Sequence, residues 1–286
     1  MLELDHLGYA AGSLPPLRAA FTNLGFALTA PRELQAVAED GRPRSLGQQS
    51  CHAVFARGYL EFTAVANAGS THHLAPWLGA TPRVAILALG CEDVEVARSV
   101  AVARGVALGP VADAVRDVDY GALAGPARFR WCALDATDTP ESLVCLVQHR
   151  DAARVFQREV QRHPNGARAL VGIEWPIPAA EFDRTLARYA ALLGVAAIRD
   201  ADDVWRFALG RESIVLRRWS TSLSVAQAAR VVIDVADLAV ARTCLQNNGV
   251  LYSESDAGLE IDADSAGGAA MRLAVVYPRD SQIAGK

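Results

Sequence analysis

The chain has 286 residues, which is enough for two ordinary domains, and 51% of them are hydrophobic, as is typical of a globular protein. Its formal net charge at pH 7 is −4, and no long run of Lys and Arg attracts phosphates, so nucleic acid and acidic membrane surfaces are excluded as general partners. No apolar run approaches the ~18 residues that a membrane-spanning helix needs.

The cysteines and the start of the chain bear on the cellular compartment. The five cysteines form no CxxC pair and are odd in number, which favours reduced, mostly buried thiols over a disulfide framework. A strand is predicted to begin within two residues of the N-terminus, which leaves no room for a signal peptide. We therefore expect a cytoplasmic protein.

One pattern recurs four times along the chain: an apolar strand, a short break, an amphipathic helix and a return to strands. In the first half, strands are predicted at 2–10, 26–30, 50–57 and 59–65 with a helix at 14–24, then at 83–90, 127–135 and 142–150 with a helix at 92–104. In the second half, they are predicted at 169–177, 204–210 and 213–219 with a helix at 179–193, then at 229–235, 258–264 and 271–277 with a helix at 238–247. Ser13 and Asp237 are the predicted N-caps of two of these helices.

Four units of this kind predict an α+β protein built from four βαβββ modules. A single module leaves one face of its sheet uncovered, so the modules are expected to pair and to form two domains. We predict the first domain at 1–150 and the second at 169–286, with a linker at 151–168. The linker has no strand character and ends in the turn sequence His163-Pro164-Asn165-Gly166.

A histidine lies in the first predicted strand, LELDHLGYA at 2–10. Successive side chains of a strand point to opposite faces, which places His6 on the same face as Leu2 and Leu4 and places Asp5 on the other. A single histidine on an apolar face is more often a hydrogen-bonded core residue than a ligand. The pattern alone leaves it open whether His6 is a hydrogen-bonded core residue or a ligand.

Several short segments resemble the vicinal oxygen chelate superfamily, and in particular its glyoxalase-like domain branch. They are LDHLGYA at 4–10, LGF at 24–26, GYLEF at 58–62, Gln148-His149 and HPNGA at 163–167. Together they cover roughly residues 1–170, whereas the remaining chain resembles the superfamily only in its pattern of elements.

The resemblance implies paired modules whose sheets curl around a cleft, with metal ligands on the first and last strands of each module. His6 takes the first-strand position of the first module, and Glu61 takes the last-strand position. In the second module the first-strand position falls near Ile86 or Leu87, neither of which can bind metal. The last-strand position falls near Val147, and His149 lies one same-face step further. The resemblance thus implies His6, Glu61 and His149 as the metal ligands.

Two imidazoles and a carboxylate suit a divalent metal such as Zn, Mn, Fe or Ni with positions open to substrate. In the metal enzymes of the superfamily, the substrate chelates the ion through adjacent oxygens, and the metal stabilises an oxyanion or activates dioxygen. By this resemblance Glu61 is also a catalytic residue. If its strand face lines the cleft, we expect His52 to be a further ligand or a general base. Tyr59 and Thr63 share a face with Glu61, and we expect them to bind substrate there.

The same residues also have interpretations that involve no function. Glu61 is then an exposed carboxylate on a solvated face, and His149 is a strand-end residue that caps backbone groups. His163 is expected to be a turn residue, and His72 and His73 are expected to be exposed in a polar loop between modules.

We expect a metal-dependent lyase or isomerase whose partner is a small oxygen-bearing metabolite. The alternative is a non-catalytic protein that sequesters a small molecule, without metal, in a cleft lined by tryptophans. Two-domain extradiol dioxygenases place a His, His, Glu iron site in the C-terminal half, but every histidine here precedes residue 164, so a ring-cleaving dioxygenase is disfavoured. The C-terminal half, in which Glu174 is expected to pair with an arginine, is interpreted as a degenerate copy that covers the first or mediates a homodimer.

Overall fold

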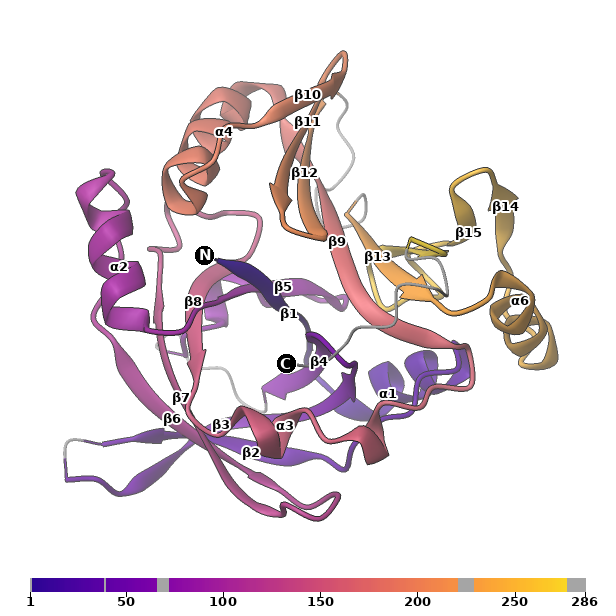
Figure 1. The fold of residues 1–286 in the computed structure, drawn as a ribbon, viewed down its shortest axis with the longest axis horizontal. Helices are drawn as coiled ribbons and strands as arrows, with labels where there is room; N and C mark the ends of the chain where they lie inside the picture. Colours follow the sequence, from indigo (N-terminus) through magenta and orange to yellow (C-terminus); the bar gives the residue numbers. More distant parts are fainter. Residues whose placement is uncertain (1, 39, 66–71, 221–228, 277–286) are drawn as a thin grey trace.

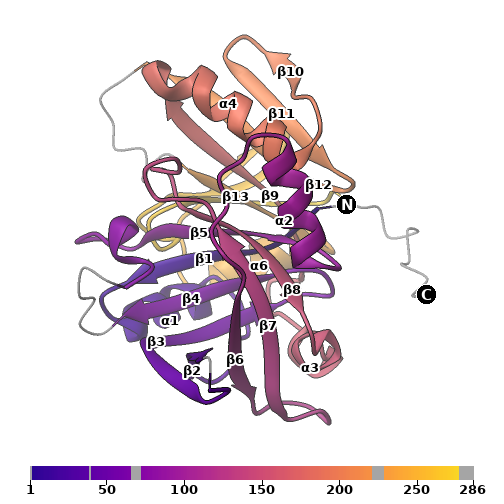
Figure 2. The same cartoon turned by 90° about the vertical axis from the view of Figure 1, so that its left-hand side faces the viewer.

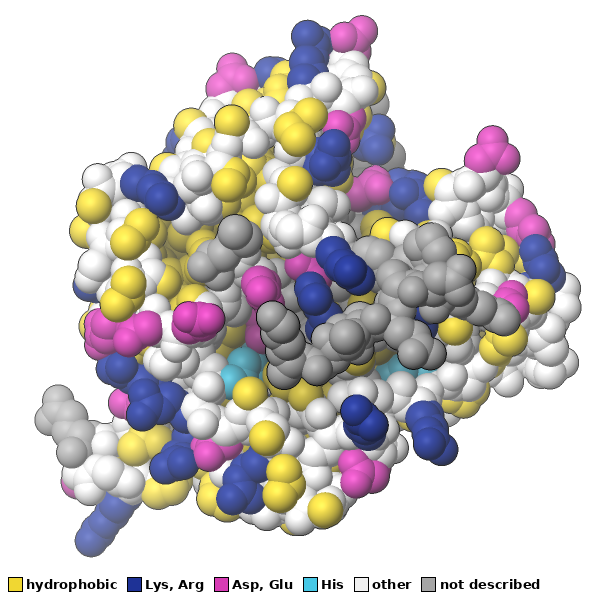
Figure 3. Space-filling model, viewed as in Figure 1, with side chains coloured by type: hydrophobic (Ala, Val, Ile, Leu, Met, Phe, Trp, Pro, Cys, Tyr) yellow, Lys and Arg dark blue, Asp and Glu magenta, His cyan; other side chains and the backbone are white. Residues whose placement is uncertain are grey.

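The computed structural model describes residues 2–38, 40–65, 72–220 and 229–276. Its strands form a closed eight-stranded barrel and a separate eight-stranded sheet with free edges (Figure 1). Within the described ranges, no helix combines the length and the apolar character needed to cross a membrane. On the face shown in Figure 3, acidic and basic side chains are interspersed rather than gathered into a patch of one sign.

The barrel consists of two modules with the same order of elements. The first contains β1 (Glu3–Ala11), α1 (Leu14–Asn23), β2 (Arg32–Val37), β3 (Pro43–Val54) and β4 (Tyr59–Val65). The second contains β5 (Arg83–Gly90), α2 (Val94–Ala103), β6 (Ala112–Val118), β7 (Gly125–Ala133) and β8 (Leu143–His149). In each module the first strand pairs in parallel with the last, and antiparallel pairing of β1 with β5 and of β2 with β6 closes the ring.

The second sheet repeats this construction without closing. Its modules are β9 (Ala167–Pro178), α4 (Ala179–Leu193), β10 (Ile198–Ala201), β11 (Val204–Leu209) and β12 (Glu212–Trp219), then β13 (Arg230–Val235), α6 (Leu238–Asn247), β14 (Ser253–Ser255), β15 (Gly258–Ile261) and β16 (Ala270–Ala274). Strands β9 and β13 pair at the centre, and β10 and β14 form the edges. The short helix α3 (Ala152–Val155) lies between the two sheets in the chain.

This arrangement confirms the prediction of an α+β protein made of four βαβββ modules in two paired sheets. Asp237 caps α6 by accepting a hydrogen bond from the Ala239 N–H, whereas Ser13 stands at the N-cap of α1 without a side-chain hydrogen bond. The last strand of the barrel ends at His149, and the next sheet begins at Ala167.

Several strands differ from those predicted. The predicted strand at 26–30 is wrong: this segment is irregular, and its backbone is fixed by contacts such as the hydrogen bond from the Thr29 N–H to the His52 carbonyl at 3.0 Å. Strands β2, β6, β10 and β14 were not predicted. Charges interrupt β6, no residue of β2 is fully buried, and β10 and β14 are exposed along their whole length. The end of the predicted strand 271–277 lies outside the described residues.

Asp5 is an extra residue in β1 relative to the neighbouring strand β5. Leu4 pairs with Leu89 and His6 pairs with Ala88, so Asp5 is left without an opposite residue. A bulge of this kind breaks the alternation of side chains. Leu4 packs into the core on the outside of the barrel and His6 faces the inside, so the expectation that they share a face is wrong.

One hydrophobic core joins the barrel to the second sheet. It contains Leu7 and Phe21 from the first module together with Ile173 and Trp175 from β9. Strands β1 and β4 contact β9 directly, and Figure 2 shows β9 to β12 lying over the barrel. The second half therefore covers the outer face of β1 and β4, which the barrel alone would leave exposed.

The linker is tied to the first module by two buried side chains. The two ring nitrogens of His163 bond to a backbone N–H and a backbone carbonyl of that module, at 3.1 and 2.9 Å. Burial lowers the pKa of His163, which keeps the ring neutral as this pattern of one acceptor and one donor requires. Asn165 donates to the Leu24 carbonyl at 2.9 Å and accepts from the Ala167 N–H at 3.0 Å. His163 is thus more than the turn residue that was expected.

We expect Asn165→Ala to lower the free energy of unfolding by about 2–4 kcal/mol, because two buried backbone groups lose their partner. Urea denaturation monitored by circular dichroism measures this change. The matched control is Asn247→Ala at an exposed position, for which we expect a change within about 0.5 kcal/mol. Equal stability of the two variants would contradict the role assigned to Asn165.

Candidate functional site

A cavity lies inside the barrel, with about 650 Å³ of space that protein atoms do not fill, part of it open to solvent. Its polar side is formed by His6, Gln48, Ser50, Glu61 and Arg116. Most of its other wall is apolar and includes Ile86, Phe129, Trp131, Leu143 and Val147. A concave, mostly apolar space with a few convergent polar groups is typical of a site for a small molecule.

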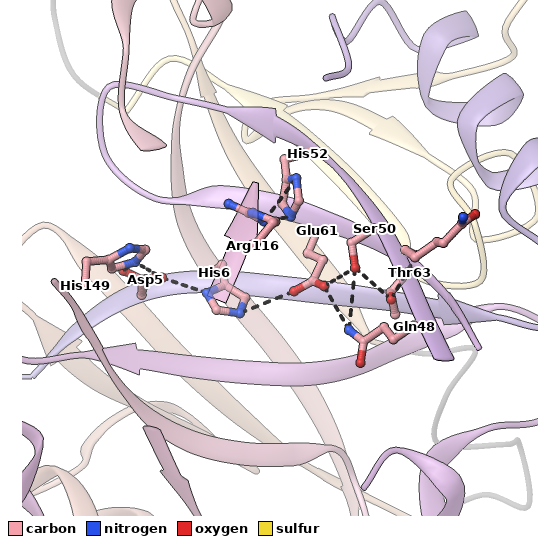
Figure 4. Close-up of polar contacts among 10 residues, drawn as sticks. Asp5, His6, Gln48, Ser50, His52, Glu61, Thr63, Arg116 and His149 are labelled. Carbon is pink, nitrogen blue, oxygen red and sulfur yellow. Dashed lines mark hydrogen bonds and ion pairs between the residues drawn. The ribbon is translucent and has the colours of Figure 1, made fainter. Parts of the chain in front are cut away.

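The Glu61 carboxylate is buried and held in one orientation (Figure 4). Its Oε1 accepts hydrogen bonds from the Ser50 hydroxyl at 2.6 Å and from the Gln48 amide at 3.2 Å. Its Oε2 lies 3.6 Å from His6 Nε2, which is longer than a direct hydrogen bond. Both of these atoms therefore keep capacity for a ligand in the cavity.

Two histidines share the Asp5 carboxylate. Its Oδ1 lies 2.6 Å from His6 Nδ1, and its Oδ2 lies 2.9 Å from His149 Nε2. Burial by itself would raise the pKa of Asp5, but the charge and hydrogen bond of His149, with the hydrogen bond of His6, outweigh burial and hold that pKa well below its ordinary value. Asp5 is therefore an anion at neutral pH, and its bond to Nδ1 leaves His6 Nε2 directed at the cavity.

Arg116 and His52 form the other polar contact of the cavity. Arg116 Nη1 donates to His52 Nε2, and the guanidinium carbon lies 5.9 Å from the centre of the Tyr59 ring and 5.4 Å from that of the Phe129 ring. Burial and the neighbouring charge of Arg116 lower the pKa of His52 well below its ordinary value. His52 is therefore neutral and can accept this hydrogen bond.

The structure brings three of the predicted site residues together at the cavity: His6, Tyr59 and Glu61 line it. The ring of Tyr59 stacks on that of His6 with centroids 4.4 Å apart. His52 and Thr63 are buried behind the lining, where His52 contacts Arg116 and Thr63 lies 2.9 Å from the Ser50 hydroxyl. Their predicted roles as ligands, bases or substrate-binding residues stay predictions.

The described residues do not form a complete set of metal ligands. His6 and Glu61 present one atom each, while the Nε2 of His149 is engaged by Asp5. The positions that the second module would supply carry apolar side chains in the cavity wall, at Ile86 and Val147. Across the described ranges, no group of three or more His, Cys, Asp or Glu side chains is placed to hold a metal ion, whereas catalytic zinc sites use three protein ligands. The set predicted from the resemblance stays a prediction.

Some members of the site are absent from the sequence-based prediction. Gln48 and Ser50 alternate with His52 along β3, and this run of polar residues on one face is the signal that would have found them. Arg116 lies in β6, which was not predicted as a strand, so no pattern pointed to it. Asp5 reaches the site only through the bulge.

His73 is not the exposed loop residue that was expected. It lines the cavity, and its ring centroid lies 5.6 Å from that of Trp131. Burial lowers the pKa of His73 to about 4, so its ring is neutral at physiological pH. The expectation failed because the contact of His73 with Trp131 joins residues far apart in the chain, which the polar composition around His73 does not reveal.

The expected pairing of Glu174 with arginine is confirmed in the second sheet. Its carboxylate lies 2.7 Å from Arg230, 3.2 Å from Arg272 and 3.4 Å from Arg217. Arg230 and Arg272 also contact Glu260. This cluster is therefore internally paired.

The chain matches a known protein family. The family of glyoxalase-like domains matches residues 4–193, which is more than half of the sequence, and the chain belongs to this family within the vicinal oxygen chelate superfamily. The match covers all of the barrel except Glu3, the first residue of β1, and extends to the end of α4. A search of curated proteins gives no match.

Solved structures share the fold at low sequence identity. A hypothetical protein from Staphylococcus aureus is 12% identical with a TM-score of 0.65, over 96% of this chain and 99% of that one. A mutant of 4-hydroxymandelate synthase from Streptomyces coelicolor is 14% identical with a TM-score of 0.57, over 96% and 92%. A xylose isomerase-like TIM barrel/4-hydroxyphenylpyruvate dioxygenase fusion protein is 15% identical with a TM-score of 0.56, over 94% of this chain and 48% of that one.

We expect Asp5→Asn to lower the free energy of unfolding by about 2–3 kcal/mol at pH 7, because two buried imidazoles lose a charged partner. Since the pKa of Asp5 is lowered by folding, its contribution is present above the ordinary carboxyl pKa and is lost as the pH falls below it. The difference between wild type and variant should therefore shrink below pH ~4. Urea unfolding at a series of pH values measures this, and a difference that stays constant down to pH ~2 would contradict the assignment.

Proposed function

We propose that the barrel cavity binds a small oxygen-bearing metabolite and that Glu61 transfers a proton on it, in lyase or isomerase chemistry. The observation that carries the proposal is the orientation of Glu61: one carboxylate oxygen is fixed by Ser50 and Gln48, and the other lies 3.6 Å from His6 Nε2 at the cavity. A carboxylate positioned in a largely apolar space is suited to act as a general base.

The neighbours of Glu61 support a division of roles. Oε2 of Glu61 is the atom expected to take a proton from a carbon next to a carbonyl group. His6, whose Nδ1–H donates to Asp5, is expected to accept a hydrogen bond through Nε2 from a hydroxyl group of the substrate and so to orient the carbon–hydrogen bond toward Glu61. Such groups need to be held in place before the reaction, and the contacts of Asp5 and Ser50 do this.

The alternative function is sequestration of a small molecule without catalysis. The observation that favours it is the apolar character of Ile86 and Val147, which stand where the second module of a metal enzyme in the superfamily would supply ligands. A mostly apolar cavity with few polar groups can hold a ligand without transforming it.

Proton exchange distinguishes the two functions. We expect the wild-type protein, incubated in deuterium oxide with a panel of small 2-oxo, 2-hydroxy and 1,2-dicarbonyl compounds, to exchange the proton next to the carbonyl group of at least one. In Glu61→Gln we expect the rate to fall by ~10²–10⁴-fold, because the base is removed while the shape is kept. Proton NMR follows the loss of the C–H signal.

The matched control is Glu181→Gln, a partly exposed carboxylate in α4 that pairs with Arg184. It should exchange at the wild-type rate. If compounds of the panel bind without exchange in any variant, proton transfer is contradicted and sequestration is favoured.

Metal content tests the predicted ligand set directly. Because the described residues offer two well-placed ligand atoms where three are usual, we expect well under one equivalent of Zn, Mn, Fe or Ni after purification without a metal-binding tag. Elemental analysis of wild type beside His6→Ala and Glu61→Ala measures this. About one equivalent that both variants lose would contradict the expectation and would support metal-dependent chemistry at His6 and Glu61.

A further inference from the structure

Arg116 is a buried cation that forms no ion pair with any described carboxylate. The residue is 5% exposed, and its Nη2 has no hydrogen bond partner in the described part of the chain. Another largely buried arginine, Arg188, shows the usual arrangement, because it pairs with Glu141. Burial of a charge is unfavourable unless a partner compensates it, so the exception at Arg116 calls for a partner from outside the chain.

His52 fixes the guanidinium of Arg116 without neutralising it. The His52 ring is neutral, accepts from Arg116 through Nε2, and has its Nδ1 3.4 Å from the hydroxyl of Thr29. The same hydroxyl accepts from the backbone N–H of His52 at 3.0 Å. The cation is therefore held in one place at the cavity with its full charge.

Aromatic rings surround the cation. Tyr59 and Phe129 lie within 6 Å of the guanidinium carbon and favour a positive charge through their ring faces. They also exclude water, so the attraction between Arg116 and an anion in the cavity is stronger than in bulk solvent. A planar guanidinium with unused N–H groups matches a carboxylate, which can accept two parallel hydrogen bonds.

The other polar end of the cavity carries the carboxyl group of Glu61, with the Asp5 anion behind His6. A ligand with one negative group is therefore attracted to Arg116, whereas a second negative group would face Glu61. Between the two ends lie apolar side chains, among them Ile86, Phe129 and Trp131. This distribution favours a monoanion with an apolar body over a dianion such as a phosphate ester.

We propose that the cavity takes a small monocarboxylic acid, with its carboxylate on Arg116 and its apolar body against Ile86, Phe129 and Trp131. The inference rests on the proposed function in taking the barrel cavity as the ligand site, and it adds the chemical class of the ligand. The carboxylate at Arg116 then leaves the rest of the molecule directed toward His6 and Glu61.

Binding of matched acids and amides tests the proposal without any turnover. Phenylacetate and 4-methylpentanoate are compared with phenylacetamide and 4-methylpentanamide, by quenching of tryptophan fluorescence and by isothermal titration calorimetry. We expect at least one acid to bind ~10–100-fold more tightly than its amide, as a charge-assisted pair in a buried site should. Phenyl phosphate should bind more weakly than phenylacetate.

Substitutions of Arg116 test whether this residue causes the preference for acid over amide. Arg116→Met should abolish the preference for acid over amide, and Arg116→Lys should keep part of it, because an ammonium retains the charge but not the planar fork. The matched control is Arg44→Met at an exposed position of β3, which should keep the wild-type preference. Thermal unfolding of each variant identifies any that fail to fold, and the comparison of acid with amide in the wild type does not depend on them.

Equal affinity for acid and amide in the wild type would overturn the proposal, and so would no detectable binding of either acid. A preference for the acid that persists in a folded Arg116→Met variant would do so as well. Failure of proton exchange in the Glu61 experiment, with acid binding that depends on Arg116, would contradict only the proposed function.

Discussion

The Asp5 carboxylate, shared between His6 and His149, is the interaction on which the candidate site depends. It exists because β1 has a bulge at Asp5, which places two successive side chains where both can reach the site. β1 also lies between β4 and β5, so its distortion affects both modules at once. Gly58 accommodates it: with φ +70 it lies so close that an added Cβ would come 2.7 Å from the Asp5 carbonyl oxygen.

Closure of the barrel buries the charged side chains of the site, so each of them needs a compensating partner. In an open sheet the polar residues of β3, β4 and β6 would face water, where an unpaired arginine costs little. Inside the ring they share a small, mostly apolar space, and each charge has to be compensated there. Asp5 is compensated by two histidines, whereas the described residues offer Arg116 only a neutral acceptor and two aromatic rings.

The two halves use the same module for different purposes. The second sheet does not close, and its central polar residues, Glu174 and Glu260 with three arginines, satisfy one another. Its apolar face completes the core around β1 and β4. The second half therefore supports the strand that carries Asp5 and His6, and the linker residues His163 and Asn165 hold it in place through buried hydrogen bonds.

The sequence by itself determined the modules, because periodicity and helix caps such as Asp237 are local, and its short motifs located the family together with His6 and Glu61. It did not determine which side chains meet. The bulge at Asp5 changes the face of every residue before it, and Arg116 reaches His52 only because a strand interrupted by charges closes the ring, 64 residues further along the chain. Such contacts were decided by the tertiary structure, since register and closure depend on pairing between distant strands and no local pattern encodes them.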